Sequence, residues 1–141
     1  MYRWLDHTAE IELELEAASE HEVLSDALDA LRELLEGNET PVSSEGWQRH
    51  KDEIERRAVR ATASDRPALL AAWLEELVFL AESEGFIAFA VERLSLEHCA
   101  LSAMVAGHVG EARPLVKAVT YHRLQFEPSE RGYRGRVVFD V

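Results

Sequence analysis

The chain has 141 residues, of which 47% are apolar and 30% charged, and its formal net charge is −12. This composition is typical of one soluble globular domain spanning residues 1–141, and so acidic a chain is a poor binder of bare nucleic acid, because phosphate contacts need cations. The single cysteine, Cys99, excludes a disulfide framework, and the absence of a long apolar run excludes a membrane span and a signal peptide, so we expect a cytoplasmic protein.

The first third of the chain predicts a strand followed by a helix. Leucine and isoleucine alternate with glutamate over residues 11–16, which is typical of a half-buried strand with a strongly acidic outer face. A helix begins at Ser19, where Glu22 completes a capping box, and ends at Gly37-Asn38. Residues 38–48 have the composition of a linker or mobile loop, and residues 50–62 alternate weakly, as a strand does.

The second helix gives the clearest pattern. Ser64 or Asp65 caps it, Pro67 lies in its first turn, and Gly85 ends it. Trp73 lies in its apolar stripe and is expected in the core. Four strands follow, at residues 86–96, 99–108, 118–127 and 133–141, with a hairpin loop at 129–132. This order predicts an α+β fold: a two-layer domain with two helices packed on one face of a mixed β-sheet.

The charge is unevenly distributed along the chain. Residues 1–40 contain 12 acidic and 2 basic residues, a net charge of −10, whereas residues 113–136 contain 6 basic and 2 acidic residues, a net charge of +4. Two solvated faces that keep the protein in solution would explain this asymmetry. A dipolar surface that docks on a partner in one orientation would explain it equally well.

The end of the sequence is a candidate metal site. Asp140 stands next to the α-carboxylate of Val141, and two adjacent anions repel each other unless a cation lies between them. If the fold brings Glu10 alongside, the three carboxylates form a hard-oxygen site suited to Ca²⁺, Mg²⁺ or Mn²⁺ rather than zinc. The alternative is a terminus that frays into water, although the apolar residues 137–139 argue for a strand docked in the sheet.

Two further polar patches flank predicted strands. In the first, His7 is a metal ligand, a general base or a ring that hydrogen-bonds its own loop, and Asp6 is a functional acid or a turn residue. In the second, Lys117 either balances the carboxylates, contacts a partner or is an ordinary surface lysine. Tyr121 and His122 follow on a predicted strand and are expected on opposite faces of it.

Familiar catalytic motifs are absent from the sequence. It has no phosphate-binding loop, no dinucleotide-binding glycine pattern, no nucleophile elbow and no H-E-x-x-H zinc motif. The residues alone therefore indicate an acidic α+β domain with a possible hard-cation site.

Four ordered motifs make the chain resemble the archease family. Archeases begin with D-H-T-A-D, which here reads Asp6-His7-Thr8-Ala9-Glu10, and continue with a tryptophan- and leucine-rich helix followed by E-G-F, here residues 72–80 and 84–86. Their K-A-V-T-Y-H segment is matched at every position by residues 117–122, and their final V-D-I-type strand by residues 138–141. The resemblance covers essentially the whole chain.

The resemblance implies a non-enzymatic protein cofactor. Archeases assist the RtcB-type RNA ligase of tRNA splicing and RNA repair, which joins 2′,3′-cyclic-phosphate or 3′-phosphate ends to 5′-hydroxyl ends. They promote guanylylation of the ligase's active-site histidine, support multiple turnover and broaden nucleotide use. The expected partner is therefore this ligase, with RNA contacted only indirectly and no membrane involved.

The resemblance also implies which residues act. The family's metal site corresponds to Glu10, Asp140 and Val141, and its functional lysine to Lys117. Glu10 departs from the usual aspartate: the charge is kept, but the carboxylate extends about one methylene further, which affects metal affinity or identity. Two rival functions are a small metal-dependent phosphoesterase that uses Glu10 and Asp140 with His7 as base, and a chaperone-like adaptor for RNA-modifying enzymes.

Overall fold

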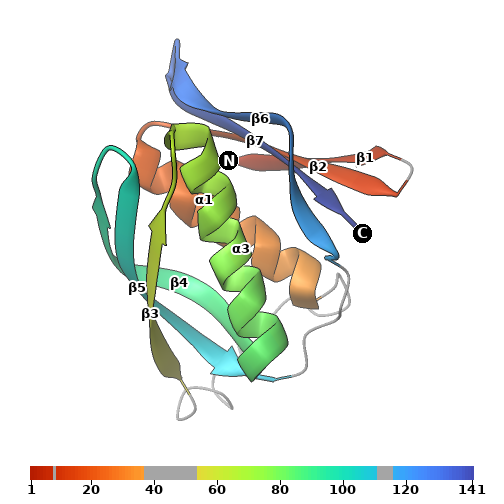
Figure 1. Cartoon of the computed structure of the whole chain (residues 1–141), viewed down its shortest axis with the longest axis vertical. Coiled ribbons are helices and arrows are strands. Elements are labelled where there is room, and N and C mark those ends of the chain that lie inside the picture. Colours follow the sequence, from red (N-terminus) through yellow and green to blue (C-terminus); the bar gives the residue numbers. More distant parts are fainter. Residues whose placement is uncertain (8, 37–53, 111–115) are drawn as a thin grey trace.

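The computed structural model describes residues 1–7, 9–36, 54–110 and 116–141, except for the side chain of His7. The predicted linker at 38–48 lies outside these residues. Two helices and seven strands occupy the described chain, and none of the described helices is long and apolar enough to cross a bilayer. In chain order the elements are β1 (Tyr2–His7), β2 (Glu10–Ala17), α1 (Glu20–Glu36), β3 (Glu55–Thr62), α3 (Arg66–Glu84), β4 (Phe86–Leu96), β5 (Ala100–Val109), β6 (Ala118–Ser129) and β7 (Gly132–Asp140) (Figure 1).

The predicted α+β class with two helices is confirmed, but the strands form two sheets instead of one mixed sheet. Sheet A has the order β1-β2-β7-β6 and sheet B the order β3-β5-β4, and every pairing in them is antiparallel. Three of the five pairings join strands that are consecutive in the chain, because a short hairpin can connect antiparallel strands whereas parallel strands need a long crossover.

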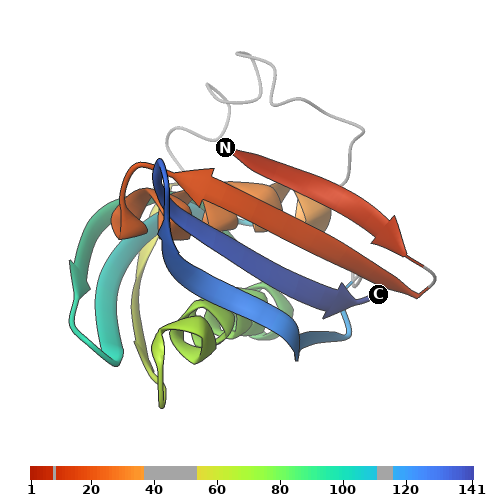
Figure 2. The same cartoon turned by 90° about the horizontal axis from the view of Figure 1, so that it is seen from above.

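Both helices pack against both sheets, so each sheet has helices on one face (Figure 2). Leucines, valines and alanines from the two helices form one core with the inner faces of the sheets. Trp73 is fully buried in this core, as predicted, and its indole N–H donates a hydrogen bond of 2.9 Å to the carbonyl oxygen of Leu24 on α1. A polar atom buried this deeply needs such a partner.

The helix ends follow the sequence signals. At α1 the hydroxyl of Ser19 accepts a hydrogen bond of 3.2 Å from the backbone N–H of Glu22, which confirms the predicted start. At α3 the cap is Asp65, whose carboxylate accepts from the N–H of Ala68 at 2.8 Å. Gly85 ends α3 with φ of +67°, a left-handed conformation that favours glycine.

Strand β1 was not predicted from the sequence. It pairs along its full length with β2, from Tyr2 opposite Leu15 to His7 opposite Glu10. The alternation of Tyr2 and Trp4, which both pack against the core, is the signal that could have found it. This strand places the Asp6-His7 patch on the outer edge of sheet A.

Candidate functional site

Segments from both extremities of the sequence meet at one end of sheet A. Glu10, the first residue of β2, lies directly opposite Asp140, the last residue of β7. The backbone N–H of Val141 donates a hydrogen bond of 3.3 Å to the carbonyl oxygen of Ala9, in the turn between β1 and β2. Figure 2 shows the end of β7 beside that turn. The final residues are therefore docked in the sheet, and they do not fray into water.

The third polar patch reaches the same place. Ala118 at the start of β6 pairs with Asp140, and the backbone N–H of Lys117 donates a hydrogen bond of 2.8 Å to the carbonyl oxygen of Asp140. The side chain of Lys117 is exposed. The structure thus brings together Glu10, Asp140, Val141 and the backbone of Lys117, although they are far apart in the sequence.

Glu10 and Asp140 lie directly opposite each other in the antiparallel pair of β2 and β7. Residues directly opposite each other in an antiparallel pair have their β-carbons about 5 Å apart and on the same face. Both residues are half-buried, and neither carboxylate makes a hydrogen bond or ion pair with another described side chain. The described residues contain no group of three His, Cys, Asp or Glu side chains at ligand spacing. The oxygen donors at this end of the sheet are the carboxylates of Glu10 and Asp140 and the main-chain oxygen of Val141, which are hard donors.

Asp6 and His7 occupy different positions relative to this pair. His7 occupies the register position opposite Glu10. Asp6 is opposite Ile11, which follows Glu10 on β2 and therefore faces the other side of the sheet. The side chain of Asp6 is exposed. The strand alternation therefore does not bring Asp6 onto the face that carries Glu10 and Asp140.

The acidic outer face predicted for β2 is present, but Glu12 on it is buried. This residue is 3% exposed although it lies on the face of sheet A away from the helices. Arg123 of β6 places a guanidinium nitrogen 3.0 Å from its carboxylate, and Arg136 of β7 places another at 3.8 Å. The carboxylate is buried beneath these two cations, which compensate the loss of its hydration.

Glu14 continues the same charged row. Arg3 binds it at 2.5 Å and Arg136 at 3.4 Å. The hydrogen bond from Arg3 lowers the pKa of Glu14 more than burial raises it, and the charges of Arg3 and Arg136 lower it further. A cleft of about 500 Å³ lies beside this part of the row and is lined by Arg3, Glu14 and Arg136 among others, but not by Glu10 or Asp140.

These ion pairs join the two oppositely charged segments of the sequence at a few positions. Strands β2 and β7 are neighbours, and Glu12 and Glu14 of β2 pair with Arg123 of β6 and Arg136 of β7 across the outer face of sheet A. The ion pairs cover Glu12 and Glu14 and do not extend to Glu10 and Asp140 at the end of the sheet.

Strand β6 carries a large bulge beside the site. Thr120 pairs with Val138 and Gln125 pairs with Arg136, so the four residues 121–124 face only one residue of β7. Regular alternation stops here, and Tyr121 and His122 are both exposed. No local pattern announces this bulge, because it depends on how β6 is aligned with β7.

Comparison with known proteins identifies the family. The model of the archease protein family matches residues 2–141. A protein archease from Methanosarcina mazei is 31% identical over 99% of this chain and 95% of its own length, and one from Methanosarcina acetivorans is 30% identical over the same shares.

Two solved structures have the same fold. The first is the solution structure of protein 1598 of Methanobacterium thermoautotrophicum, with a TM-score of 0.69 at 23% identity over 99% of this chain and 98% of that one. The second is the crystal structure of an archease from Thermotoga maritima, described as a possible chaperone, with a TM-score of 0.62 at 21% identity over 100% and 98% of the two chains. With a family match over nearly its whole length and relatives of about 30% identity, this chain belongs to the archease family.

Proposed function

We propose that this protein is a non-enzymatic activator of an RtcB-type RNA ligase in tRNA splicing and RNA repair, and that it promotes guanylylation of the ligase and its turnover. Membership of the archease family supports the proposal, as does the four-motif resemblance from which this partner was expected. The acidic composition supports a role on the ligase instead of on RNA, because a protein with a net charge of −12 is repelled by a polyanion.

The end of sheet A is the part that would act. Glu10, Asp140 and a main-chain oxygen of Val141 would hold one divalent cation, Ca²⁺, Mg²⁺ or Mn²⁺, since all three bind oxygen donors. Such a cation supplies a positive centre that attracts phosphate oxygens. The strand pairing places the backbones of Glu10 and Asp140 directly opposite each other, so only their side chains would need to adjust to a cation.

Lys117 has a separate role in this proposal. Its backbone is fixed to Asp140, whereas its side chain is exposed and can reach a partner. The ammonium group of this side chain could bind an acidic or phosphate group on the ligase, or turn toward the two carboxylates and balance their charge. The observation that carries the whole proposal is that Glu10 lies directly opposite Asp140 while Val141 is hydrogen-bonded to Ala9.

Single-turnover guanylylation of the cognate ligase, with and without this protein, tests the function. We expect a faster reaction with the wild-type protein, and a loss of at least tenfold of that acceleration with Asp140→Asn and with Lys117→Ala. Glu16→Gln is the matched control, because Glu16 lies on the same strand and face as Glu10 but about 20 Å away, and it should behave as wild type.

Two results would contradict the proposal. One is an unchanged guanylylation rate on addition of the wild-type protein. The other is full acceleration by both Asp140→Asn and Lys117→Ala. Phosphoester hydrolysis by the purified protein alone, lost in Asp140→Asn, would instead support the phosphoesterase alternative.

A further inference from the structure

The bulge in β6 combines an irregular pairing with β7 and an uncommon backbone conformation. Residues 121–124 are opposed by Val137 alone, and Arg123 has φ of +56°, a left-handed conformation that is uncommon for a residue other than glycine. Bulges of this kind re-aim side chains and are frequent next to active sites. A left-handed arginine persists only where surrounding contacts hold it.

Those contacts are supplied by Glu12. A guanidinium nitrogen of Arg123 lies 3.0 Å from Oε1 of Glu12, and the glutamate side chain is only 4% exposed. Oε1 makes no hydrogen bond within the described residues, so charge attraction to Arg123 is what compensates its burial. The side chain of Arg123 must cross β7 to reach β2, and Val138 of β7, on that same face, is fully buried without being part of the core cluster. The bulge is therefore fixed onto the outer face of sheet A.

The fixed bulge exposes an aromatic ring. Tyr121 is 61% exposed, one of four large apolar or aromatic side chains that are exposed in the described parts of the chain. His122 beside it is also exposed, and its backbone N–H donates a hydrogen bond of 3.4 Å to the hydroxyl of Thr120. Tyrosine is among the residues that most often dominate binding energy at protein interfaces, since it combines a large rigid ring with a polar group.

The position of Tyr121 relates it to the carboxylate pair. Thr120, its neighbour, pairs with Val138, and two residues earlier Ala118 pairs with Asp140. Two residues of a strand span about 7 Å, so the bulge begins one strand repeat from the Glu10–Asp140 end. Tyr121 therefore lies close enough to the carboxylate pair for one partner to contact both.

We infer that Tyr121 is the anchor by which this protein binds the ligase, and that the Glu12–Arg123 ion pair positions it. The partner surface would offer an apolar pocket for the ring beside the groups that meet the acidic end of sheet A. This inference rests on the proposed function and adds to it a binding residue that carries no charge and no metal. Tyr121 provides affinity, whereas Glu10, Asp140 and Lys117 provide activation.

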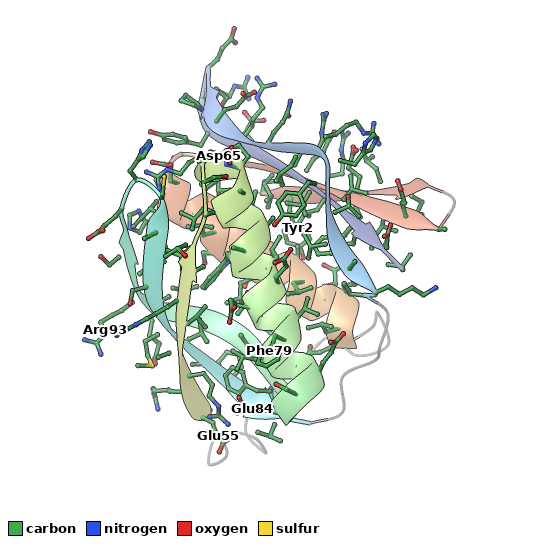
Figure 3. All side chains as sticks on the ribbon, in the orientation of Figure 1. Tyr2, Glu55, Asp65, Phe79, Glu84 and Arg93 are labelled. Atoms are coloured by element: carbon green, nitrogen blue, oxygen red, sulfur yellow. The ribbon has the colours of Figure 1, made fainter. Side chains whose placement is uncertain are left out.

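A titration of guanylylation rate against protein concentration separates affinity from activation. For Tyr121→Ala we expect the concentration giving half-maximal acceleration to rise at least tenfold, with the rate at saturation unchanged. Phe79→Ala is the matched control, because Phe79 is an exposed aromatic residue of similar exposure, 60%, on a different element. It lies on α3, near the end of that helix opposite Asp65 (Figure 3), and its replacement should leave both values unchanged.

The positioning role of Arg123 has its own test. Arg123→Ala removes the ion pair and should raise the half-maximal concentration as Tyr121→Ala does, again without lowering the rate at saturation. Arg123→Lys keeps the charge near Glu12 and should restore most of the lost affinity. Circular dichroism on each variant verifies the fold, because a partly unfolded variant would lower the saturating rate.

The outcomes distinguish this inference from the proposed function. If the wild-type protein accelerates guanylylation but Tyr121→Ala has the wild-type half-maximal concentration, the docking role of Tyr121 is wrong and the proposed function stands. If Tyr121→Ala instead lowers only the saturating rate, the residue is not an affinity anchor and the inference is also wrong. If the wild-type protein gives no acceleration, the proposed function itself fails.

Discussion

The phenol of Tyr2 hydrogen-bonds the carboxylate of Glu33 across the β1–α1 contact. Burial is the largest of the causes that raise the pKa of Tyr2 to about 12; the hydrogen bond to Glu33 and the negative charges of Glu33, Asp29 and Asp26 contribute the rest. The ring also packs against the core. The phenol therefore attaches the first strand to the first helix only while it remains protonated.

This arrangement predicts a sensitivity to alkali. In the unfolded chain a tyrosine loses its proton near pH 10, whereas folded Tyr2 keeps it up to about pH 12. The stability that depends on this proton is fully present below pH 10 and is lost as the pH rises toward 12. In Tyr2→Phe the free energy of unfolding should fall less steeply over that interval, as measured by denaturant titration at several pH values. Identical slopes for the variant and the wild-type protein would contradict the assignment.

At the scale of single residues, the sequence predicted well what is local and poorly what is not. Trp73 and the caps at Ser19 and Asp65 depend on a few neighbouring residues, and the structure has them as expected. The alternation with leucines and isoleucine placed Glu12 on the outer face of its strand but did not indicate that it is buried there. Its burial depends on Arg123, which is more than 100 residues away in the chain, and no local pattern reports such a partner.

At the scale of elements, the start of α3 gives a second test. Two residues, Ser64 and Asp65, were equivalent cap candidates in the sequence, and the structure assigns the role to Asp65, which has an extended backbone with φ of −154° and ψ of 177°. Asp65→Ala should lower the free energy of unfolding by about 1 kcal/mol, because it removes the acceptor for the N–H of Ala68.

Ser64→Ala provides the matched control for this cap. Its side chain is exposed and does not cap the helix, so we expect a change within about 0.5 kcal/mol. Thermal or denaturant unfolding of both variants measures the difference. A larger loss for Ser64→Ala than for Asp65→Ala would show that the cap has been assigned to the wrong residue.

The pairing of the strands could not be predicted in the same way as the helices. Hydrophobic alternation located six of the seven described strands, but it does not specify neighbours, so two antiparallel sheets were expected as one mixed sheet. The bulge at 121–124 is of the same kind, since it exists only relative to β7. Sheet topology and register depend on contacts between distant segments, whereas helix ends depend on adjacent residues.

At the scale of the whole molecule, the fold places three separate polar patches at one end of sheet A. Each patch was identified from the sequence. The metal site was predicted only if the fold brings Glu10 next to the end of the chain. The antiparallel pairing of β2 with β7 and of β7 with β6 fulfils that condition for Glu10, Asp140 and Lys117. The ion pairs along the rest of the outer face involve Glu12 and Glu14 and leave out Glu10 and Asp140. A cation bound there would lower the repulsion between the two carboxylates.

Titration of the protein with Mn²⁺, followed by calorimetry, tests the central claim most directly. We predict one site in the wild-type protein, a loss of affinity of at least tenfold in Glu10→Gln and in Asp140→Asn, and wild-type affinity in Glu16→Gln, whose carboxylate is on the same strand and face but remote from Asp140. Binding that is unchanged by both Glu10→Gln and Asp140→Asn, or that is weakened equally by Glu16→Gln, would show that the two ends of the sequence do not form a cation site.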